Sequence, residues 1–257
     1  MKALTPALAL GLGLGLAAQT ASAGLVDFNP PEYPLGASLI VNPDWTNAGS
    51  GNLFTITSLG GGDGAAQSTT SAESAFSNAH FVPAAAFLGT PDTTTAGNAY
   101  DFSFQLRFDQ IGGSDDFRLD HRIMIGGTDG SPIIAFDLFA NSRLQYLTGS
   151  GSQNAVNVNG NALNLDDVGN TRFISVEGVI DVDAGTYDLT IDGVEQGTGL
   201  GLVNTPADFG QVTLQRRTGE ADALQFSLDN LEIGLVPEPG TLGLAAIGSG
   251  LLMLRRR

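Results

Sequence analysis

The sequence predicts an all-β protein, an antiparallel β-sandwich, from three observations. Apolar and polar residues alternate with a period of two in several stretches, most clearly over residues 100–109, which is typical of strands with one buried and one solvent-facing side. The 35 glycines supply turns between these stretches. Between its two ends the chain shows no sustained apolar period of 3.6 residues. Many short strands, glycine-rich turns and almost no helix favour a sandwich.

The predicted strands follow one another with clear turns between them. The strand over 100–109 has Phe, Tyr or Leu at every even position and polar residues at every odd one. Asp192-Gly193 is predicted to be a two-residue hairpin turn, because both residues tolerate positive φ. A bulge is predicted near Asp229-Asn230, since the apolar residues before and after it have opposite parity. The other strands are expected near 117–125, 133–139, 144–147, 174–182, 187–191 and 212–214.

One segment does not fit this pattern. Residues 60–98 are rich in Gly, Ala, Ser and Thr, and they are predicted to contain a long loop or an insertion. No internal repeat with a fixed spacing is visible, which argues against a propeller or a solenoid. We therefore expect residues 24–234 to form one β-sandwich domain.

Three of the stretches together resemble the strand pattern of concanavalin-like, laminin-G-like jelly rolls. They are Ala99–Phe108, Gly185–Gly193 and Phe226–Ile233, and the resemblance covers residues 37–234. It implies a jelly-roll sandwich, to which the sequence adds an N-terminal signal helix and a C-terminal short apolar helix. It also implies a fold that often binds one calcium ion for structural reasons.

Residues 1–23 are typical of a secretory signal peptide. Lys2 gives a positive start, residues 4–18 are almost wholly Ala, Leu and Gly, and Ala21-Ser22-Ala23 has the small residues at Ala21 and Ala23 that signal peptidase accepts. The mature chain is then expected to begin at Gly24. A buried N-terminal helix is the alternative, but three glycines at alternate positions would each cost about 1 kcal/mol in a helix interior.

Residues 235–257 predict a membrane-directed tail. Pro237, Glu238 and Pro239 break the chain, residues 241–254 carry no charge, and Arg255, Arg256 and Arg257 end it. Arginines on the cytoplasmic side resist being pulled through the bilayer. The apolar run gives about 20 Å of helix against a hydrocarbon core of about 30 Å. That length suits a transient sorting intermediate better than a permanent anchor or a core helix, the two alternatives.

This tail resembles the PEP-CTERM sorting signal of Gram-negative bacteria. The resemblance rests on the Pro-Glu-Pro motif at 237–239, the apolar span and the three terminal arginines. It implies an exosortase-type membrane protease as a partner, with transient association with the inner membrane. It also implies that the exported protein is finally located at the cell surface or in the extracellular matrix.

The charge and the residue counts exclude several classes of function. The net charge is −16, with 27 acidic and 11 basic residues. Nucleic-acid binding is excluded because phosphate contacts need clustered Lys or Arg. There is no cysteine, so thiolate zinc sites and disulfides are excluded. With only His80 and His121, a histidine-rich metal centre is excluded too.

No catalytic residue is predicted. The best candidates for a pair of glycosidase carboxylates are Glu177, Asp181 and Asp183, which alternate along one expected strand. The Glu-x-Asp-x-x-Glu pattern of laminarinase-type glycosidases is absent, so these acids are interpreted as residues on the solvent-facing side of the strand. His80 and His121 lie in strand-like contexts without a Gly-x-Ser-x-Gly elbow and are interpreted as structural.

A structural calcium ion is the one cofactor left open, with no ligand assigned. Acids in or near turns offer hard oxygen ligands, but the EF-hand spacing does not occur and such acids also cap turns without a metal. The residues concerned are Asp63, Asp115, Asp116, Asp129, Asp166, Asp167, Asp229 and Asn230.

Sugar binding would need aromatic rings that stack on pyranose faces. Trp45, within the polar run 42–47, is the first candidate and Tyr146 the second. The alternative for Trp45 is a place in the core. The sequence thus predicts a non-enzymatic exported protein, adhesive or glycan-associated, with extracellular polysaccharide as its partner. A polysaccharide-acting glycosidase on the same scaffold and a purely structural coat component are the alternatives.

The predicted signal peptide and the predicted sorting tail can be tested on protein from its native cells. Intact-mass and terminal-peptide mass spectrometry should find a mature chain that starts at Gly24 and lacks the residues of the apolar tail. A chain that retains Met1 would contradict the signal peptide, and one that retains Arg257 would favour a permanent anchor.

Overall fold

The computed structural model describes most of one compact unit, Ala21–Val236. The described residues are 24–47, 54–60, 63–68, 77–81, 99–110, 119–127, 130–139, 141, 143–163, 172–204, 210–216 and 225–236. The predicted signal peptide and the tail beyond Val236 lie outside them, as do both expected flanking helices. In the described part, no helix has the length and apolar character needed to cross a bilayer.

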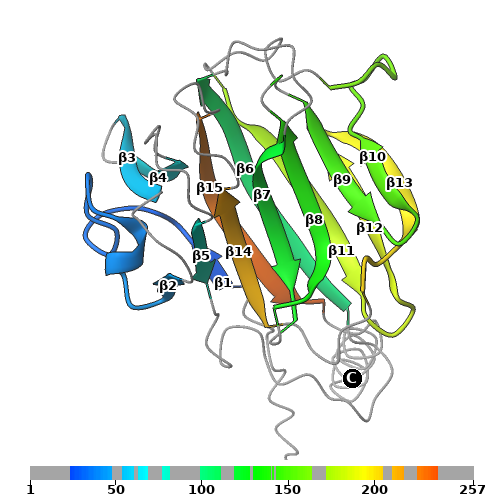
Figure 1. Cartoon of the computed structure of the whole chain (residues 1–257), viewed down its shortest axis with the longest axis horizontal. Helices are drawn as coiled ribbons and strands as arrows, with labels where there is room; N and C mark the ends of the chain where they lie inside the picture. Colours follow the sequence, from blue (N-terminus) through cyan, green and yellow to red (C-terminus); the bar gives the residue numbers. More distant parts are fainter. Residues whose placement is uncertain are drawn as a thin grey trace, which may run out of the picture. The chain divides into compact units, whose positions relative to one another are not determined.

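The described strands form two antiparallel sheets, which lie as two layers in Figure 1. The described residues also include one 3-10 helix, η1 (Leu39–Val41). Sheet A has the order β13 (Val194–Gly201), β12 (Thr186–Ile191), β11 (Ile174–Asp181), β6 (Ala99–Gln110), β15 (Gln225–Leu235), β4 (Asp63–Ser68) and β3 (Phe54–Gly60), with β1 (Gly24–Val26) also paired to β15. Sheet B has the order β10 (Gly151–Asn154), β9 (Leu144–Thr148), β8 (Pro132–Phe139), β7 (Leu119–Gly126), β14 (Gln211–Arg216), β5 (Ser77–Phe81) and β2 (Trp45–Asn47).

The chain changes sheets repeatedly, so strands that follow one another often face each other across the core. It passes from β6 in sheet A through β7 to β10 in sheet B, returns for β11 to β13, and then places β14 and β15 in opposite sheets. The strands that flank β6 are therefore β11 and β15, which come much later in the sequence. This arrangement confirms the predicted all-β sandwich.

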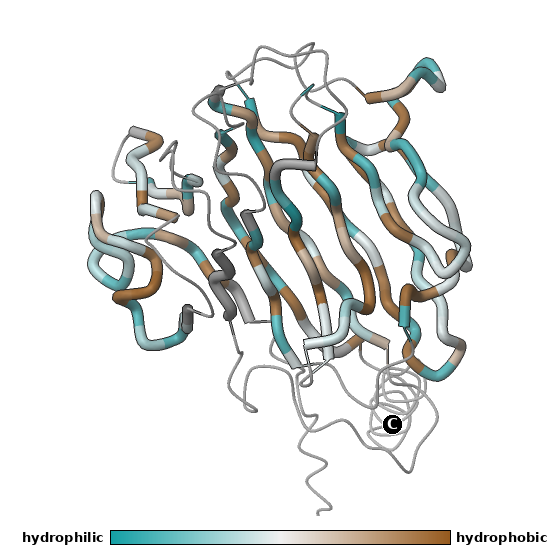
Figure 2. Tube along the Cα trace, in the orientation of Figure 1, coloured by the Kyte–Doolittle hydropathy of each residue, from teal (hydrophilic) through white to brown (hydrophobic). Residues whose placement is uncertain are grey.

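The core lies between the sheets and is built by the alternation that the sequence shows. Hydrophobic and hydrophilic residues alternate along the strands in Figure 2. The even-numbered side chains of β6, from Tyr100 to Phe108, are all at most 2% exposed. Phe102 and Phe104 reach across to Phe136 of β8, with ring centroids 6.2 Å and 5.3 Å apart. Each such aromatic group contributes about 1.5–3 kcal/mol by burial.

The predicted turn and bulge are both present. Asp192 and Gly193 have φ values of 51° and 74° and join β12 to β13, as a two-residue hairpin of the primed type requires. Asn230 has φ 49°, and the register between β15 and β6 shifts between Asp229 and Glu232. The bulge turns Phe226 and Leu231, which differ in parity, to the same buried side.

Two stretches within 60–98 are strands rather than loop: β4 and β5 lie there and belong to opposite sheets. Strand β4 was hidden by its small residues, which have low strand propensity. They are needed for close packing: Ala65 and Ala66 are fully buried, and a Cβ at Gly64 would lie 2.3 Å from the carbonyl oxygen of Phe28. The rest of 60–98 lies outside the described residues.

Substitution of Gly64 tests this close approach. Gly64→Ala should lower the free energy of unfolding by about 1–3 kcal/mol, because backbone atoms must shift to admit the methyl group. Gly201→Ala is the matched control, since its Cβ would have no neighbour nearer than 3.8 Å, and it should change stability by less than about 0.5 kcal/mol. Urea titrations followed by circular dichroism measure both. Equal effects of the two changes would contradict the packing described for β4.

Candidate functional site

The outer face of sheet B is closed along β8, the neighbour of its central strand β7. Every residue of β8 from Ile133 to Leu138 is buried. Asp137, on the outer side, accepts two hydrogen bonds from the guanidinium of Arg122, at 2.5 and 2.8 Å. This bidentate ion pair neutralises both charges and fixes the two side chains against each other. We therefore find no open site along β8 in the part of the chain that the structure describes.

The outer face of sheet A, in contrast, is hollowed by a groove of about 460 Å³. Its floor is the backbone around Phe102, Gly178 and Leu189, because the side chains of Phe102 and Leu189 are buried in the core. Its walls are the outward-facing side chains of four strands, which we call the groove residues: Asp101, Ser103, Glu177, Val179, Asp188, Thr190 and Glu232.

Strand register arranges the groove residues in two rows across the sheet. In the first row Ser103 pairs with both Glu232 and Glu177, and Glu177 pairs with Thr190. Carboxylates and hydroxyls therefore alternate from strand to strand. In the second row Val179 pairs with both Asp101 and Asp188. Because neighbouring strands lie about 4.8 Å apart, the acids within a row have Cα atoms about 9.6 Å apart.

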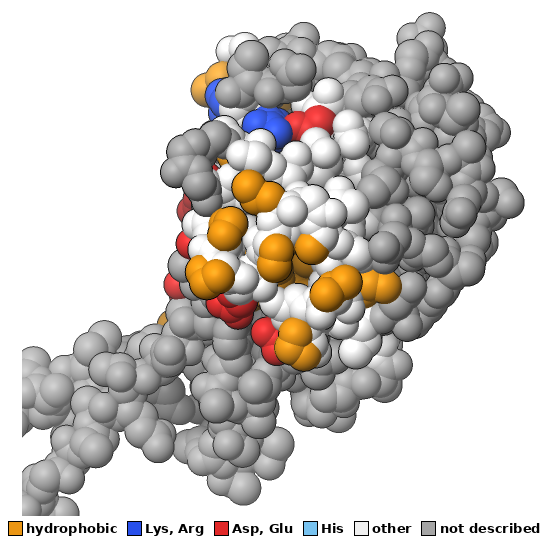
Figure 3. Space-filling model, turned by 90° about the vertical axis from the view of Figure 1, so that its left-hand side faces the viewer, with side chains coloured by type: hydrophobic (Ala, Val, Ile, Leu, Met, Phe, Trp, Pro, Cys, Tyr) orange, Lys and Arg blue, Asp and Glu red, His pale blue; other side chains and the backbone are white. Residues whose placement is uncertain are grey.

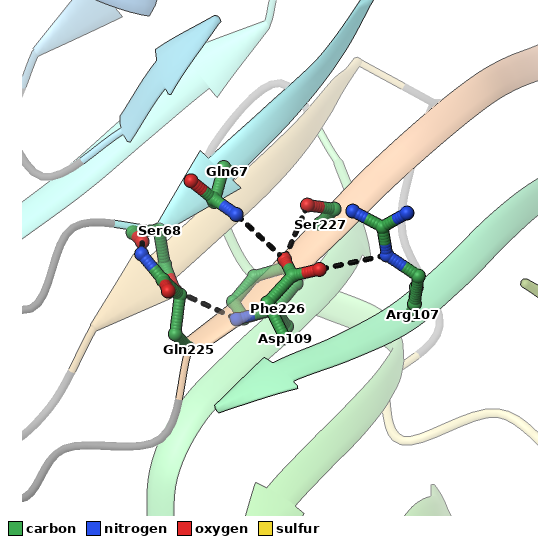
Figure 4. Close-up of polar contacts among 7 residues, drawn as sticks. All are labelled: Gln67, Ser68, Arg107, Asp109, Gln225, Phe226 and Ser227. Atoms are coloured by element: carbon green, nitrogen blue, oxygen red, sulfur yellow. Dashed lines mark hydrogen bonds and ion pairs between the residues drawn. The ribbon is translucent and has the colours of Figure 1, made fainter. Parts of the chain in front are cut away.

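The opposite end of the same face is sealed by a polar network (Figure 4). Asp109 of β6 accepts hydrogen bonds from Arg107 at 2.7 Å, from Gln67 at 2.9 Å and from the hydroxyl of Ser227. The Arg107 guanidinium also lies over the ring of Phe173, 4.8 Å from its centroid. This network ties β4 to β15 and β6, and it neutralises the acid at that end.

The structure separates the three acids that were the best glycosidase candidates. Glu177 is exposed in the groove, whereas Asp181 accepts a hydrogen bond from the backbone N–H of Ala184 at 2.8 Å and caps the turn after β11. Asp183 lies in that turn. The sequence missed the other acids of the groove, because they come from three further strands.

The two histidines lie in sheet B. His121 of β7 is fully buried and packs edge-on against Phe226, with ring centroids 5.0 Å apart, in agreement with its structural interpretation. His80 lies in β5, between Thr46 of β2 and Thr213 of β14. Neither residue is among those that line the groove.

Both proposed stacking residues lie in the core. Trp45 belongs to β2 and is 2% exposed; its ring lies against Phe28 and its indole N–H donates to the Tyr33 hydroxyl at 3.4 Å. Burial raises the pKa of Tyr33 to about 12. Tyr146 is 6% exposed and donates to the carbonyl oxygen of Gln196 at 3.3 Å. In this conformation neither ring offers a face to a sugar. Trp45 is therefore a core residue, which is the alternative considered for it.

Two of the acids considered for calcium, Asp63 and Asp229, lie close enough for their charges to interact. Asp229 is 2% exposed, and burial raises the pKa of its carboxyl to about 6, helped by the charges of Asp63 and Asp27. The backbone N–H of Asn230 donates to Asp229 at 2.8 Å, which opposes the rise. Among the described residues no group of three or more acids or histidines is arranged to hold a metal ion. The remaining candidates, Asp115, Asp116, Asp129, Asp166 and Asp167, lie outside the described residues.

The face formed by the N-terminal strands carries scattered apolar side chains rather than one site. Figure 3 shows separate hydrophobic groups there, with acidic groups along the border. Leu35 and Val41 are 46% and 72% exposed. Single exposed apolar residues of this kind are normal on protein surfaces, so the groove of sheet A is the better candidate.

Comparison with known proteins supports the fold. No protein-family model and no curated protein matches the sequence. A solved structure described as a sialidase is similar over 84% of this chain and 19% of its own, with a TM-score of 0.54 and 13% identity. A botulinum neurotoxin type C structure, described as dependent on two ganglioside molecules for cell entry, is similar over 89% and 51%, with a TM-score of 0.51 and 12% identity.

A third similar structure is the binding domain of botulinum neurotoxin DC in complex with rat synaptotagmin II. It covers 83% of this chain and 48% of its own, with a TM-score of 0.50 and 13% identity. This chain thus spans about a fifth of the sialidase and about half of each neurotoxin chain. At such low identity the similarity shows the fold alone, which is the concanavalin-like jelly-roll sandwich.

The buried carboxyl of Asp229 predicts a specific dependence of stability on pH. Its pKa rises from the ordinary 3.8 to about 6 on folding, so the folded chain binds this proton more tightly than the unfolded chain. The stability that the proton contributes is full below about pH 4 and is lost as the pH rises through about 6. Asp229→Asn removes the titration while keeping the shape of the side chain. The variant should therefore be more stable than the wild type at pH 7.5 and lose that advantage near pH 4.

Thermal melts at several pH values measure this difference. Glu32→Gln is the control, because Glu32 is exposed and the substitution changes the net charge by the same amount. An advantage of Asp229→Asn that stays constant from pH 4 to 7.5, or that Glu32→Gln shares, would contradict the assignment.

Proposed function

We propose that this chain is an exported, non-enzymatic protein of the cell surface or extracellular matrix, and that its sandwich binds polysaccharide in the groove of sheet A. The groove itself carries the proposal. It combines carboxylates and hydroxyls, which hydrogen-bond to sugar hydroxyls, with the half-exposed apolar side chain of Val179 (39% exposed), which can contact the C–H face of a sugar ring. A few convergent polar groups around an apolar contact are typical of ligand sites.

The similar structures add support of a weaker kind. The neurotoxin described as dependent on two ganglioside molecules shares the sandwich, and gangliosides present sugars at a membrane surface. Function is not inherited with a fold. The proposal therefore rests on the hydrogen-bonding groups and the apolar contact that the groove residues of this chain provide.

Export and sorting by the two ends form the second part of the proposal. In the described part of the chain, which starts at Gly24, the sandwich begins with β1 at that residue, the expected first residue after signal-peptide cleavage. At the other end Val236, where the described residues stop, donates to the carbonyl oxygen of Ala99 at 2.9 Å. Pro237 follows it directly. In this proposal signal peptidase and an exosortase-type protease act on segments outside the sandwich.

A glycosidase is the second candidate, because one observation favours it. Glu177 and Glu232 lie two strands apart, with Cα atoms about 9.6 Å from each other. Inverting glycosidases need two carboxyl groups about 6.5–9.5 Å apart, and rotation of the two glutamate side chains can bring their carboxyl groups into that range from this Cα spacing. The groove lining, however, offers no exposed aromatic ring to hold the substrate, since Phe102 is 2% exposed.

A steric block tests polysaccharide binding without altering charge. Ser103→Trp would place a large side chain within the groove and should reduce retention on polysaccharide at least tenfold. Ser175→Trp is the matched control: Ser175 lies on the outer face of the neighbouring β11 and does not line the groove. It should leave retention unchanged. Affinity electrophoresis through gels that contain neutral, amine-bearing or acidic polysaccharides measures the effect.

The same samples separate the two candidates. A lectin-like protein should release no reducing ends during prolonged incubation with any polysaccharide that retains it. Release by the wild type that Glu177→Gln abolishes would establish the glycosidase. Retention that both tryptophan variants leave intact would place binding elsewhere on the molecule.

A further inference from the structure

The charge of the groove is of one sign. Among the ten residues that line it, four are carboxylic acids, Asp101, Glu177, Asp188 and Glu232, and none is basic. Asp188 accepts a hydrogen bond from the backbone N–H of Gly199 at 2.8 Å. Within the described part of the chain no side chain forms an ion pair with any of the four. The groove therefore presents uncompensated negative charge to its ligand.

The basic side chains near this face are already engaged. Arg107, on the same face of β6, is held by Asp109 at 2.7 Å. Arg172 forms a bidentate pair with Asp192, with both contacts at 2.7 Å. Neither guanidinium is among the groups that line the groove. The acids of the groove thus have to find their counter-charge in the ligand or in the solvent.

The geometry of the acids suits an extended ligand. The first row continues past Thr190 to Glu195 of β13, so that Glu232, Glu177 and Glu195 stand two strands apart in succession. With about 4.8 Å per strand, this gives a carboxylate about every 9.6 Å across the sheet. Ser103 and Thr190 supply hydroxyls between the acids. A polymer with regularly repeated positive charges would meet several acids at once, and such contacts reinforce one another.

We infer that the polysaccharide held in this groove carries free, protonated amino groups, as in a polymer of unacetylated amino sugars. This inference rests on the proposed function and specifies the ligand class. An acidic glycan would meet four like charges with no basic group to offset them. A neutral glycan would donate hydroxyl hydrogen bonds to the carboxylates but would leave their negative charge uncompensated. An amine at a sugar ring donates to a carboxylate in a charge-assisted hydrogen bond, the stronger kind, while the rest of the ring contacts Val179.

The test compares two sugars of the same backbone on the full chain. The probes are the β-1,4-linked hexamer of glucosamine and its fully N-acetylated counterpart, and isothermal titration calorimetry measures binding at pH 6. The glucosamine hexamer should bind at least tenfold more tightly. Its affinity should fall severalfold between 50 and 300 mM NaCl, because salt screens exposed charges.

Paired variants distinguish the groove from the acidic surface as a whole. Glu177→Gln with Glu232→Gln should weaken binding of the glucosamine hexamer about tenfold. Glu32→Gln with Asp44→Asn removes the same number of charges from exposed positions outside the groove and should have little effect. Circular dichroism of each pair shows that the sandwich is intact.

Each outcome decides a different point. Tighter binding of the amine form that only the groove pair weakens supports the inference. Equal binding of both hexamers, lost in Ser103→Trp, overturns the inference and leaves the proposed function standing. Amine binding that both variant pairs weaken equally overturns it as well, because the attraction is then diffuse. Absence of binding to these hexamers and to every polysaccharide in the gels overturns both.

Discussion

Burial of the even-numbered side chains of β6 between the two sheets is the constraint on which the rest of the structure depends. A strand has a period of two, so packing Phe102 and Phe104 against Phe136 forces the odd-numbered residues outward. Asp101 and Ser103 therefore face solvent, where β11 and β15 bring their own outward residues beside them. A one-residue slip would exchange core and groove together, so the same packing holds the fold and arranges the site.

The sequence predicted those parts of the fold that local patterns encode. The alternation over 100–109, the Asp192-Gly193 turn and the bulge at Asp229-Asn230 each depend on neighbouring residues, and each is present. Strand β4 could not be predicted, because its Gly and Ala residues reflect the close approach of Phe28, a tertiary contact. Trp45 stands within polar residues, which hid its burial against a distant part of the core.

The candidate site was less predictable than the fold for a physical reason. Its residues come from four strands, and Ser103, Glu177 and Glu232 become neighbours only through register across β6, β11 and β15. The sequence identified Glu177 but grouped it with acids of its own strand. Period-two spacing indicates which side chains share a face, whereas the pairing of distant strands decides which of them meet.

The place of β15 in sheet A has a consequence for how the protein can be made. This strand is the last in the described chain, yet it pairs with β6, β4 and β1, which come from the first half of the sequence. Those early strands have no complete sheet to join until the final strand is available, so the native state depends on long-range pairing. A ribosome delivers the chain from its N-terminus, so sheet A stays incomplete until β15, near the end of the described residues, has emerged.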